Sequence, residues 1–178
     1  HKSAKRLLTL INDTIRLSQL DTSEQKVIYE AIDLYKIAED CVNMLKFSAE
    51  NHGITISIHG TNAYLEGNKE MLEEVVYNLC DNAIRYNNEG GKVDVTVKPV
   101  KGKIYLCVED NGIGISKEHQ ERIFERFYRV DKSRSKSTGG TGLGLAIVKN
   151  AVILHGGTIF AKNNPGGGLE FIFTLCKE

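Results

Sequence analysis

The sequence of 178 residues has little of several features that mark specialised classes of protein. No stretch approaches the ~18 uninterrupted apolar residues of a membrane-spanning helix, and no signal-peptide pattern opens the chain. An excess of one charge is also missing, because 23 basic residues balance 23 acidic ones. We therefore expect no membrane contact by these residues, and no nucleic-acid partner, since a nucleic-acid binder normally carries a basic excess.

Cysteine and proline are both scarce. The four cysteines lie far apart, form no Cys-x-x-Cys pair, and sit in apolar runs where a free thiol behaves as a small buried hydrophobic group. We therefore expect a reduced, cytoplasmic protein rather than a disulfide scaffold. Only two prolines, Pro99 and Pro165, accompany 17 glycines, and the glycines gather in a few places.

Apolar periodicity predicts an initial helix followed by a mixed α/β chain. Over residues 3–20, apolar side chains recur at three- and four-residue spacing, which indicates an amphipathic helix. This spacing leaves open whether the helix belongs to a bundle in a longer chain or packs on its own domain. The elements expected next are a strand over 27–30, a helix over 34–49, strands over 54–58 and 63–66, a helix capped by Asn68, a hairpin over 93–108, a short helix over 117–128, a helix from Thr141 to about His155, and strands near 158–162 and 169–175. Three main helices against one mixed sheet predict a two-layer α/β sandwich.

One face of the helix after Asn68 carries polar side chains. Asn78, Asn82 and Arg85 lie at positions i, i+4 and i+7, and Tyr86 is adjacent. Asparagine is a poor helix former, so two on one face indicate a task such as offering amide oxygens to Mg²⁺. A solvated helix face is the simpler explanation of this feature taken alone.

Glycines gather where the backbone could approach a ligand. Asp110 ends a predicted strand before Gly112 and Gly114, so its carboxylate could accept a hydrogen bond from a ligand amine. An Asp-Asn-Gly turn is the plain alternative. The run 139–145 leads into an apolar helix whose first N–H groups suit phosphate, although it matches neither a P-loop nor a dinucleotide fingerprint. A flexible loop with a helix cap is the alternative there.

A basic segment adjoins the second glycine run. Residues 129–141 carry four basic residues and one acidic residue, a net charge of +3. This composition fits a mobile lid over an anionic ligand, and a solvated loop is the alternative. Together, a carboxylate, a basic lid, a glycine-led helix start and paired asparagine amides describe a pocket for ATP and Mg²⁺.

The order and spacing of these motifs resemble those of sensor histidine kinases of two-component systems. The resemblance covers the N box at 78–86, the G1 box at 110–115, the F box at 122–129, the G2 box at 140–147, and the last glycine motif at 166–168 with Phe171 and Phe173. Residues 3–20 also resemble the second helix of that family's dimerisation hairpin.

The resemblance implies a Bergerat-type α/β sandwich that binds ATP and Mg²⁺. By match, the catalytic residues would be Asn78, Asn82, Arg85 and Arg129, with Asn82 as the metal ligand and Arg129 near the γ-phosphate. Asp110 would accept the adenine amine. The nucleotide would also contact Tyr86, Gly112, Gly114, Ile115, Phe127, Gly140, Thr141, Gly142, Leu143, Gly144, Leu145 and, at the adenine end, Thr174.

The sequence departs from the family at the phosphoacceptor motif. None of its five histidines precedes an acidic residue, and neither proline follows a threonine. We therefore expect residues 1–22 to be the second hairpin helix, with the first helix absent, and residues 23–178 to be the catalytic ATP-binding domain. Such a chain would bind ATP without autophosphorylating alone.

The resemblance further implies transfer of the ATP γ-phosphoryl group to a histidine outside this chain, then relay to an aspartate of a response regulator. The implied partners are ATP, the acceptor hairpin and the response regulator, within a homodimeric parent protein anchored in a membrane. Two alternatives remain. One is a conformational ATPase of the gyrase, chaperone or mismatch-repair type, in which Glu74 would activate water. The other is a nucleotide-binding module without activity.

Overall fold

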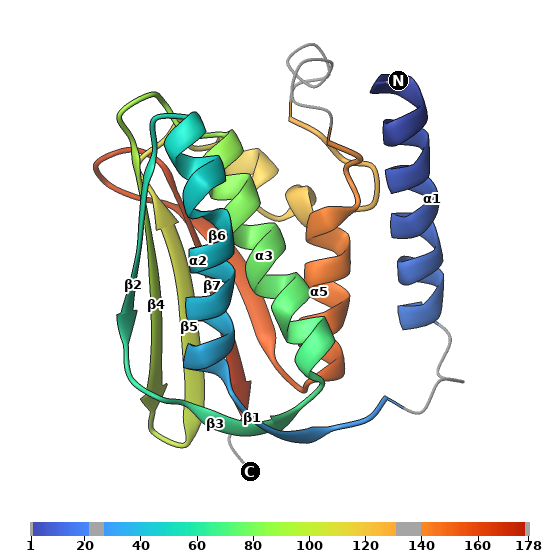
Figure 1. The fold of residues 1–178 in the computed structure, drawn as a ribbon, viewed down its shortest axis with the longest axis vertical. Coiled ribbons are helices and arrows are strands. Elements are labelled where there is room, and N and C mark those ends of the chain that lie inside the picture. Colours follow the sequence, from blue (N-terminus) through green and yellow to red (C-terminus); the bar gives the residue numbers. More distant parts are fainter. Residues whose placement is uncertain (1, 22–26, 131–139, 177–178) are drawn as a thin grey trace.

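The fold has two layers, a five-stranded sheet and a group of helices that covers one face of it (Figure 1). The computed structural model describes residues 2–21, 27–130 and 140–176. Its elements are α1 (Lys2–Asp21), β1 (Glu30–Asp33), α2 (Leu34–Asn51), β2 (Thr55–Gly60), β3 (Tyr64–Gly67), α3 (Lys69–Arg85), β4 (Lys92–Val100), β5 (Lys103–Asp110), the 3₁₀ turns η1 (Lys117–His119) and η2 (Arg122–Phe124), α5 (Gly144–Leu154), β6 (Thr158–Asn163) and β7 (Leu169–Cys176).

The five-stranded sheet is mixed, as predicted. Its strand order is β2-β4-β5-β7-β6; β2 and β4 run parallel, and the other neighbours run antiparallel. Val93, Val95 and Val97 alternate along β4 and are fully buried, as the period of two in the sequence predicts. The β4–β5 turn places Lys101 and Gly102 at φ 48° and 78°, which suits a tight two-residue hairpin.

The helix layer begins at side-chain caps that the sequence supplies. Asp33 Oδ1 accepts a hydrogen bond from the Tyr35 N–H at 3.1 Å, and Asn68 Oδ1 accepts one from the Met71 N–H at 2.9 Å. The predicted cap at Asn68 is therefore confirmed. From these caps α2 and α3 turn their apolar stripes into one core, which α5 completes. The two-layer sandwich with three main helices is confirmed.

Two predicted elements were misplaced. The strand expected over 27–30 begins only at Glu30, because its partner β3 is four residues long and the ladder starts at the Glu30–Gly67 pair. The helix expected over 117–128 is instead the two short turns η1 and η2. The chain leaves helical geometry at Glu125, whose ψ is 146°; Phe127 then takes a φ of 61°, and its N–H donates to the Gly142 carbonyl at 2.9 Å.

The cysteines are free thiols, and one of them differs from expectation. Cys41, Cys80 and Cys107 are buried, as their apolar surroundings predict. Cys176 is exposed, so the expectation of burial was wrong there. It is the last residue of β7, and because its neighbour Leu175 is buried under the helices, the alternation of the strand turns Cys176 to the opposite face of the sheet.

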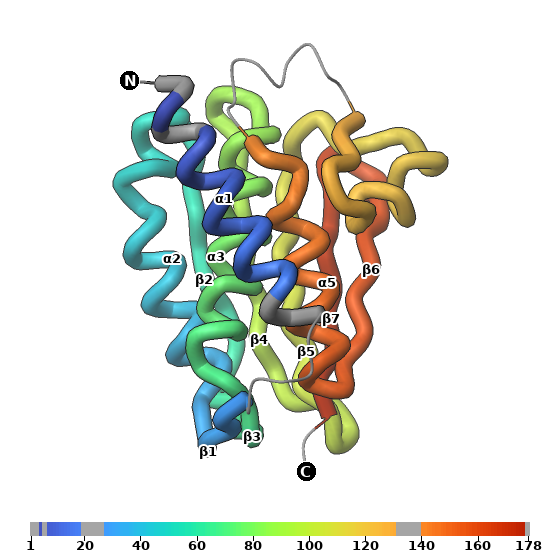
Figure 2. The backbone as a smooth tube through the Cα atoms, turned by 90° about the vertical axis from the view of Figure 1, so that its right-hand side faces the viewer, coloured from blue at the N-terminus to red at the C-terminus, as the bar shows by residue number. Residues whose placement is uncertain are grey.

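Helix α1 lies outside the sandwich, alongside α5 (Figures 1 and 2). The helix predicted over 3–20 is confirmed, and Leu17, 4% exposed, anchors it in a small apolar cluster with residues of α5. The opposite face remains open, since Leu7, Leu8, Ile11 and Ile15 are each about half exposed. Within the described ranges, no helix is both long and apolar enough to cross a membrane. The predicted domain boundary at residues 22 and 23 lies outside the described residues.

Residues 27–29, just before β1, are attached to the sandwich at His155. The His155 Nε2 atom accepts from the Asn68 N–H at 2.9 Å, so Nδ1 carries the proton and faces the Ala151 carbonyl at 2.7 Å. The Tyr29 ring meets the imidazole edge-on, and its hydroxyl donates to the Leu154 carbonyl at 2.9 Å. The neutral imidazole therefore joins the start of α3, the end of α5 and the incoming chain.

Burial lowers the pKa of His155 below its ordinary value, against a smaller opposing effect of its bond to Ala151. Below about pH 6.5 the unfolded chain binds a proton that the folded chain resists, so this group destabilises the fold as the pH falls. We expect His155→Gln to lose less unfolding free energy than the wild type between pH 7.5 and 5.5, measured by urea denaturation. His52→Gln, at an exposed imidazole, is the control and should follow the wild type. Parallel curves for wild type and His155→Gln would contradict this assignment.

Candidate functional site

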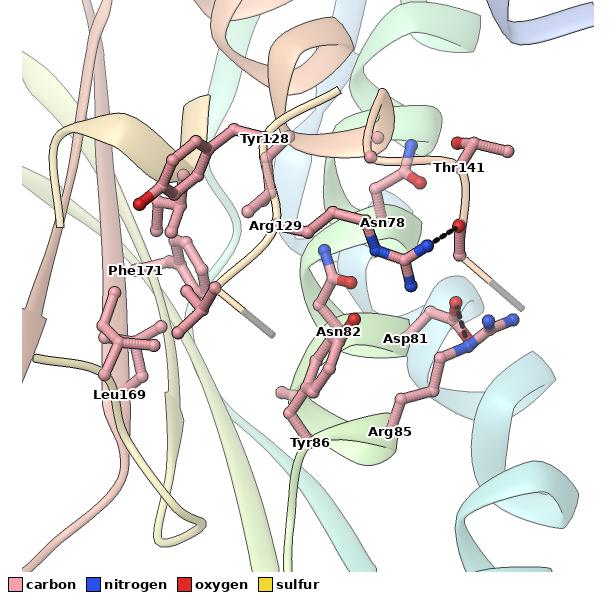
Figure 3. Close-up of a pocket in the computed structure, with 18 of the residues that line it drawn as sticks. Asn78, Asp81, Asn82, Arg85, Tyr86, Tyr128, Arg129, Thr141, Leu169 and Phe171 are labelled. Atoms are coloured by element: carbon pink, nitrogen blue, oxygen red, sulfur yellow. Dashed lines mark hydrogen bonds and ion pairs between the residues drawn. The ribbon is translucent and has the colours of Figure 1, made fainter. Parts of the chain in front are cut away.

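One cavity of about 730 Å³ opens between α3, the segment after β5 and the start of α5 (Figure 3). It contains most of the residues that the sequence marked as a site. The predicted residues that line it are Asn78, Asn82, Arg85, Tyr86, Asp110, Gly114, Ile115, Arg129, Gly140, Thr141, Gly142, Gly144 and Leu145. Thus the polar face of α3 and both glycine runs meet at one place, although they are far apart in sequence.

Three predicted residues adjoin the cavity without lining it, for different reasons. Gly112 packs so tightly that a Cβ would lie 2.7 Å from the Tyr86 carbonyl oxygen. Phe127 turns its ring to solvent and is 61% exposed. Leu143 is fully buried beneath the start of α5. These three residues therefore contribute to the site through the position of their backbone and not through a side chain in the lining.

The structure separates Thr174 from the cavity. Its neighbours Phe173 and Leu175 are buried in the core beneath the helices, so the alternation of β7 turns Thr174 to the opposite face of the sheet. There its hydroxyl pairs with the Thr158 hydroxyl at 2.9 Å. The prediction of Thr174 at the adenine end is therefore wrong. Which face of the sheet a residue occupies depends on the alternation and register of the strand, and a motif match in the sequence does not reveal it.

The carboxylate of Asp110 forms the deep end of the cavity. Among the described residues it is the buried charged side chain, at 7% exposed. Its Oδ1 atom accepts from the Gly112 N–H at 2.8 Å and the Leu169 N–H at 3.2 Å. Burial raises the pKa of Asp110, and these two bonds partly oppose the rise. No hydrogen bond within the described part of the chain uses Oδ2, so that oxygen can accept one from a ligand.

Apolar side chains surround the deep end. Ile115 and Ile123 line it from the segment after β5, and Leu169 and Phe171 line it from β7. Figure 3 shows Leu169 and Phe171 on the side opposite α3. An apolar slot with a single carboxylate oxygen suits a flat heterocycle that carries an N–H donor.

The other end of the cavity is built for negative charge. Helix α5 begins at Gly144 without a side-chain cap, so the N–H groups of its first turn face outward with the positive end of the helix dipole. Arg129 donates to the Gly140 carbonyl at 2.7 Å, which holds its guanidinium beside this turn. Arg85 pairs with Asp81 one turn earlier, at 2.8 Å. Both arginines are visible in Figure 3 on the α3 side of the cavity.

The paired asparagines lie between the two ends of the cavity. Their amide oxygens suit a cation whose other ligands are oxygen atoms of a bound anion. Asn78 Nδ2 donates to the Glu74 carbonyl at 2.9 Å, and its Oδ1 lies toward Gly144. The Asn82 amide has no hydrogen bond to another described residue. The described residues contain no cluster of three His, Cys, Asp or Glu side chains able to hold a metal ion. Mg²⁺ commonly takes few protein ligands and completes its shell with phosphate oxygens and water.

Sequence reasoning missed part of the lining. The missed residues are Thr9, Asp13, Tyr77, Asp81, Ala83, Ile113, Ile123, Tyr128, Val130, Leu169 and Phe171, and Glu74 entered only as a rival base. Alternation along β7 could have found Leu169 and Phe171. Nothing local marks Thr9 and Asp13, because they reach the cavity through the packing of α1. The lid predicted over 129–141 falls mostly on residues 131–139, outside the described residues.

Comparison with known proteins gives concordant matches. The family described as histidine kinase-, DNA gyrase B- and HSP90-like ATPases matches residues 67–178. The sensor-like histidine kinase SenX3 of Mycolicibacterium smegmatis is 40% identical over 171 residues, covering 96% of this chain and 44% of its own length. The chain thus spans less than half of that curated relative.

Solved structures agree with these sequence matches. The mycobacterial sensor histidine kinase MprB superposes with a TM-score of 0.75 at 27% identity, covering 84% of this chain and 97% of its own. Full-length ShkA in complex with AMPPNP superposes with a TM-score of 0.85 at 25% identity, covering 99% of this chain and 37% of its own. The latter alignment extends over α1 as well as the sandwich.

The attachment of Asp110 depends on Gly168, at φ 89°, where a Cβ would overlap the Asp110 carbonyl oxygen. We expect Gly168→Ala to lower the unfolding free energy by at least about 2 kcal/mol, through backbone strain and that overlap. Gly166→Ala is the matched control, since a Cβ at that position would have no other atom within 4 Å and its φ is not left-handed; we expect a change of less than ~0.5 kcal/mol. Chemical denaturation measures both, and equal effects would refute the role of Gly168.

Proposed function

Because the chain belongs to the family of histidine kinase-, DNA gyrase B- and HSP90-like ATPases, we propose that it is the catalytic ATP-binding part of a sensor histidine kinase. The observation that carries this proposal is a single cavity with a buried carboxylate in an apolar slot at one end and a glycine-led helix start at the other. Residues 23–178 form the catalytic domain, and residues 1–22 form the second helix of a dimerisation hairpin.

In this proposal the adenine occupies the apolar slot. Its exocyclic amine donates to Asp110 Oδ2, while Gly114 allows the ring close to the backbone. Ile115 and Tyr86 contact the base from the two sides. The match to the ATPase family and the AMPPNP bound by ShkA support a purine nucleotide there. The Asp110 oxygen discriminates for an amine donor, because an acceptor at that position would face a negative charge.

The phosphates lie at the start of α5 in this proposal. The N–H groups of Gly144 and Leu145 donate to them, and Arg129 and Arg85 neutralise their charge. The amide oxygen of Asn82 holds Mg²⁺, with Asn78 beside it. When bound, that ion supplies further charge neutralisation on the phosphates. The chain itself orients the γ-phosphoryl group and excludes water from it.

The reaction is transfer of the γ-phosphoryl group from ATP to an imidazole nitrogen outside this chain. The bond from phosphorus to the β,γ-bridging oxygen breaks, a P–N bond forms, and ADP leaves. Relay to an aspartate of a response regulator follows. The sensor kinase SenX3, 40% identical, supports this assignment. The acceptor hairpin and the regulator are the partners, and the parent protein is a homodimer that carries this domain in the cytoplasm beneath a membrane anchor.

One observation favours a second candidate, a conformational ATPase that hydrolyses ATP. Glu74 lines the cavity one turn before Asn78, and burial raises the pKa of its carboxyl, as a water-activating base requires. Arg16 of α1 lies 3.6 Å from Glu74 and opposes that rise. Steady phosphate release that Glu74→Gln abolishes would support this candidate over the kinase.

Replacing the Asp110 carboxylate tests the nucleotide site. Asp110→Asn keeps an acceptor for the Gly112 and Leu169 N–H groups, but it turns a donor toward the adenine amine. We expect the dissociation constant for ATP with Mg²⁺ to rise at least about tenfold, measured by calorimetry. Glu109→Gln removes the adjacent exposed carboxylate and should bind like the wild type. Unchanged affinity in Asp110→Asn would exclude the proposed contact.

Supplying the acceptor in trans tests the kinase activity. We expect no labelled product when the chain is incubated alone with Mg²⁺ and γ-labelled ATP. Addition of a separately produced hairpin that carries the acceptor histidine should give acid-labile, base-stable label on the hairpin, and none when that histidine is replaced by alanine. Tight ATP binding without transfer to hairpins from several related sensor kinases would argue against kinase activity while leaving the nucleotide site intact.

A further inference from the structure

Helix α1 contacts the phosphate end of the cavity at three points. Leu17 packs among Leu143, Ala146 and Ile147 at the start of α5. At the preceding residue, the Arg16 guanidinium lies 3.6 Å from the Glu74 carboxylate of α3. One and two turns before Leu17, Asp13 and Thr9 enter the lining of the cavity itself. Figure 2 shows α1 lying along α5 at this side of the molecule.

The closest of these contacts joins Asp13 to Thr141. The Thr141 hydroxyl donates to Asp13 Oδ2 at 2.6 Å and accepts from the Leu143 N–H at 3.3 Å. A hydroxyl has one proton to donate, and Asp13 takes it. A phosphate oxygen that is to accept from Thr141 must therefore displace the Asp13 carboxylate.

The negative charge of Asp13 also opposes the binding of phosphate. The Asp13 carboxylate lines the same cavity as Arg129, Gly140 and Gly144, the groups that make its far end suitable for anions. A carboxylate at this end neutralises part of the positive charge of Arg129 and of the helix start, and it repels a polyphosphate. The apolar slot at Asp110 is at the other end and has no contact with α1 among the bonds of the described residues.

We propose that Asp13 holds α1 on the catalytic domain as a competitor of nucleotide phosphates, so that docking of α1 and binding of ATP oppose each other. This inference rests on the proposed function, because it assigns a regulatory contact to the same nucleotide site. Competition is reciprocal by linkage: if docked α1 weakens ATP binding, bound ATP weakens the docking of α1 by the same factor. Bound ATP therefore weakens, by that factor, the docking of the helix whose open face carries Leu7, Leu8, Ile11 and Ile15.

The competition predicts a dependence on phosphate number. Adenosine occupies only the slot at Asp110 and leaves Thr141 with Asp13, so its affinity does not respond to α1. ATP must displace Asp13, so its affinity does respond. Removal of Asp13 should thus change the affinity for ATP selectively, whereas a general loosening of the fold would weaken both ligands.

Calorimetry on the full chain tests this selectivity. We expect Asp13→Ala to bind ATP with Mg²⁺ about three- to tenfold more tightly than the wild type, with adenosine affinity changed less than twofold. Glu50→Gln removes an exposed carboxylate of α2 away from the cavity and controls for net charge; it should match the wild type for both ligands. Equal or weaker ATP binding by Asp13→Ala overturns the competition.

A second variant and a second readout guard against local effects at Asp13. Leu17→Ala removes the apolar anchor of α1 without touching Thr141, and it should also tighten ATP binding. In the wild type, saturating ATP should speed amide hydrogen exchange in α1, and adenosine should not. If ATP slows exchange in α1, the proposal fails. If neither the wild type nor any variant binds ATP, the proposed function itself fails, which is distinct from equal binding by wild type and Asp13→Ala.

Discussion

The buried carboxylate of Asp110 is the constraint on which the site depends. A carboxylate removed from water needs hydrogen bonds, and two backbone N–H groups supply them from different segments, the turn after β5 and the first residue of β7. One side chain therefore fixes the turn that follows its own strand and the start of the neighbouring strand. The apolar slot forms between these two segments, so its width is set by the bonds that hold the charge.

Glycine is what permits these segments to approach one another. Gly112 lies against the Tyr86 carbonyl at the end of α3, and Gly168 lies against the Asp110 carbonyl at a left-handed φ. Gly142 has a φ of 78°, and a Cβ there would lie 3.1 Å from the Phe127 backbone. The three positions join the end of α3, the end of β5 and the segment before α5. The glycine motifs of the sequence thus mark backbone contacts between motifs as well as space for a ligand.

Much of the fold followed from local patterns in the sequence, and the errors have physical causes. The stripes of α2 and α3, the cap at Asn68 and the β4–β5 hairpin all depend on neighbours in sequence, so periodicity and turn chemistry predicted them. The helix expected over 117–128 was wrong because η2 ends at Phe124, where Glu125 takes an extended backbone, and the left-handed Phe127 bonds to Gly142 instead of continuing a helix. Thr174 was misplaced because sheet register decides its face. Asp13 was missed because only the packing of α1 brings it to Thr141.

Helix α5 connects the ligand cavity with the contact between His155 and Tyr29 at the other end of the helix layer. Its first residue, Gly144, lines the cavity, and its last turn meets the imidazole of His155, against which Tyr29 of the incoming segment packs. Eleven residues give a stiff rod of about 16 Å. A displacement of Tyr29 would therefore act on the last turn of α5, whose first turn carries the N–H groups that face the cavity. Tyr29 and the ligand cavity thus contact opposite ends of one helix, and the path between them does not pass through the sheet.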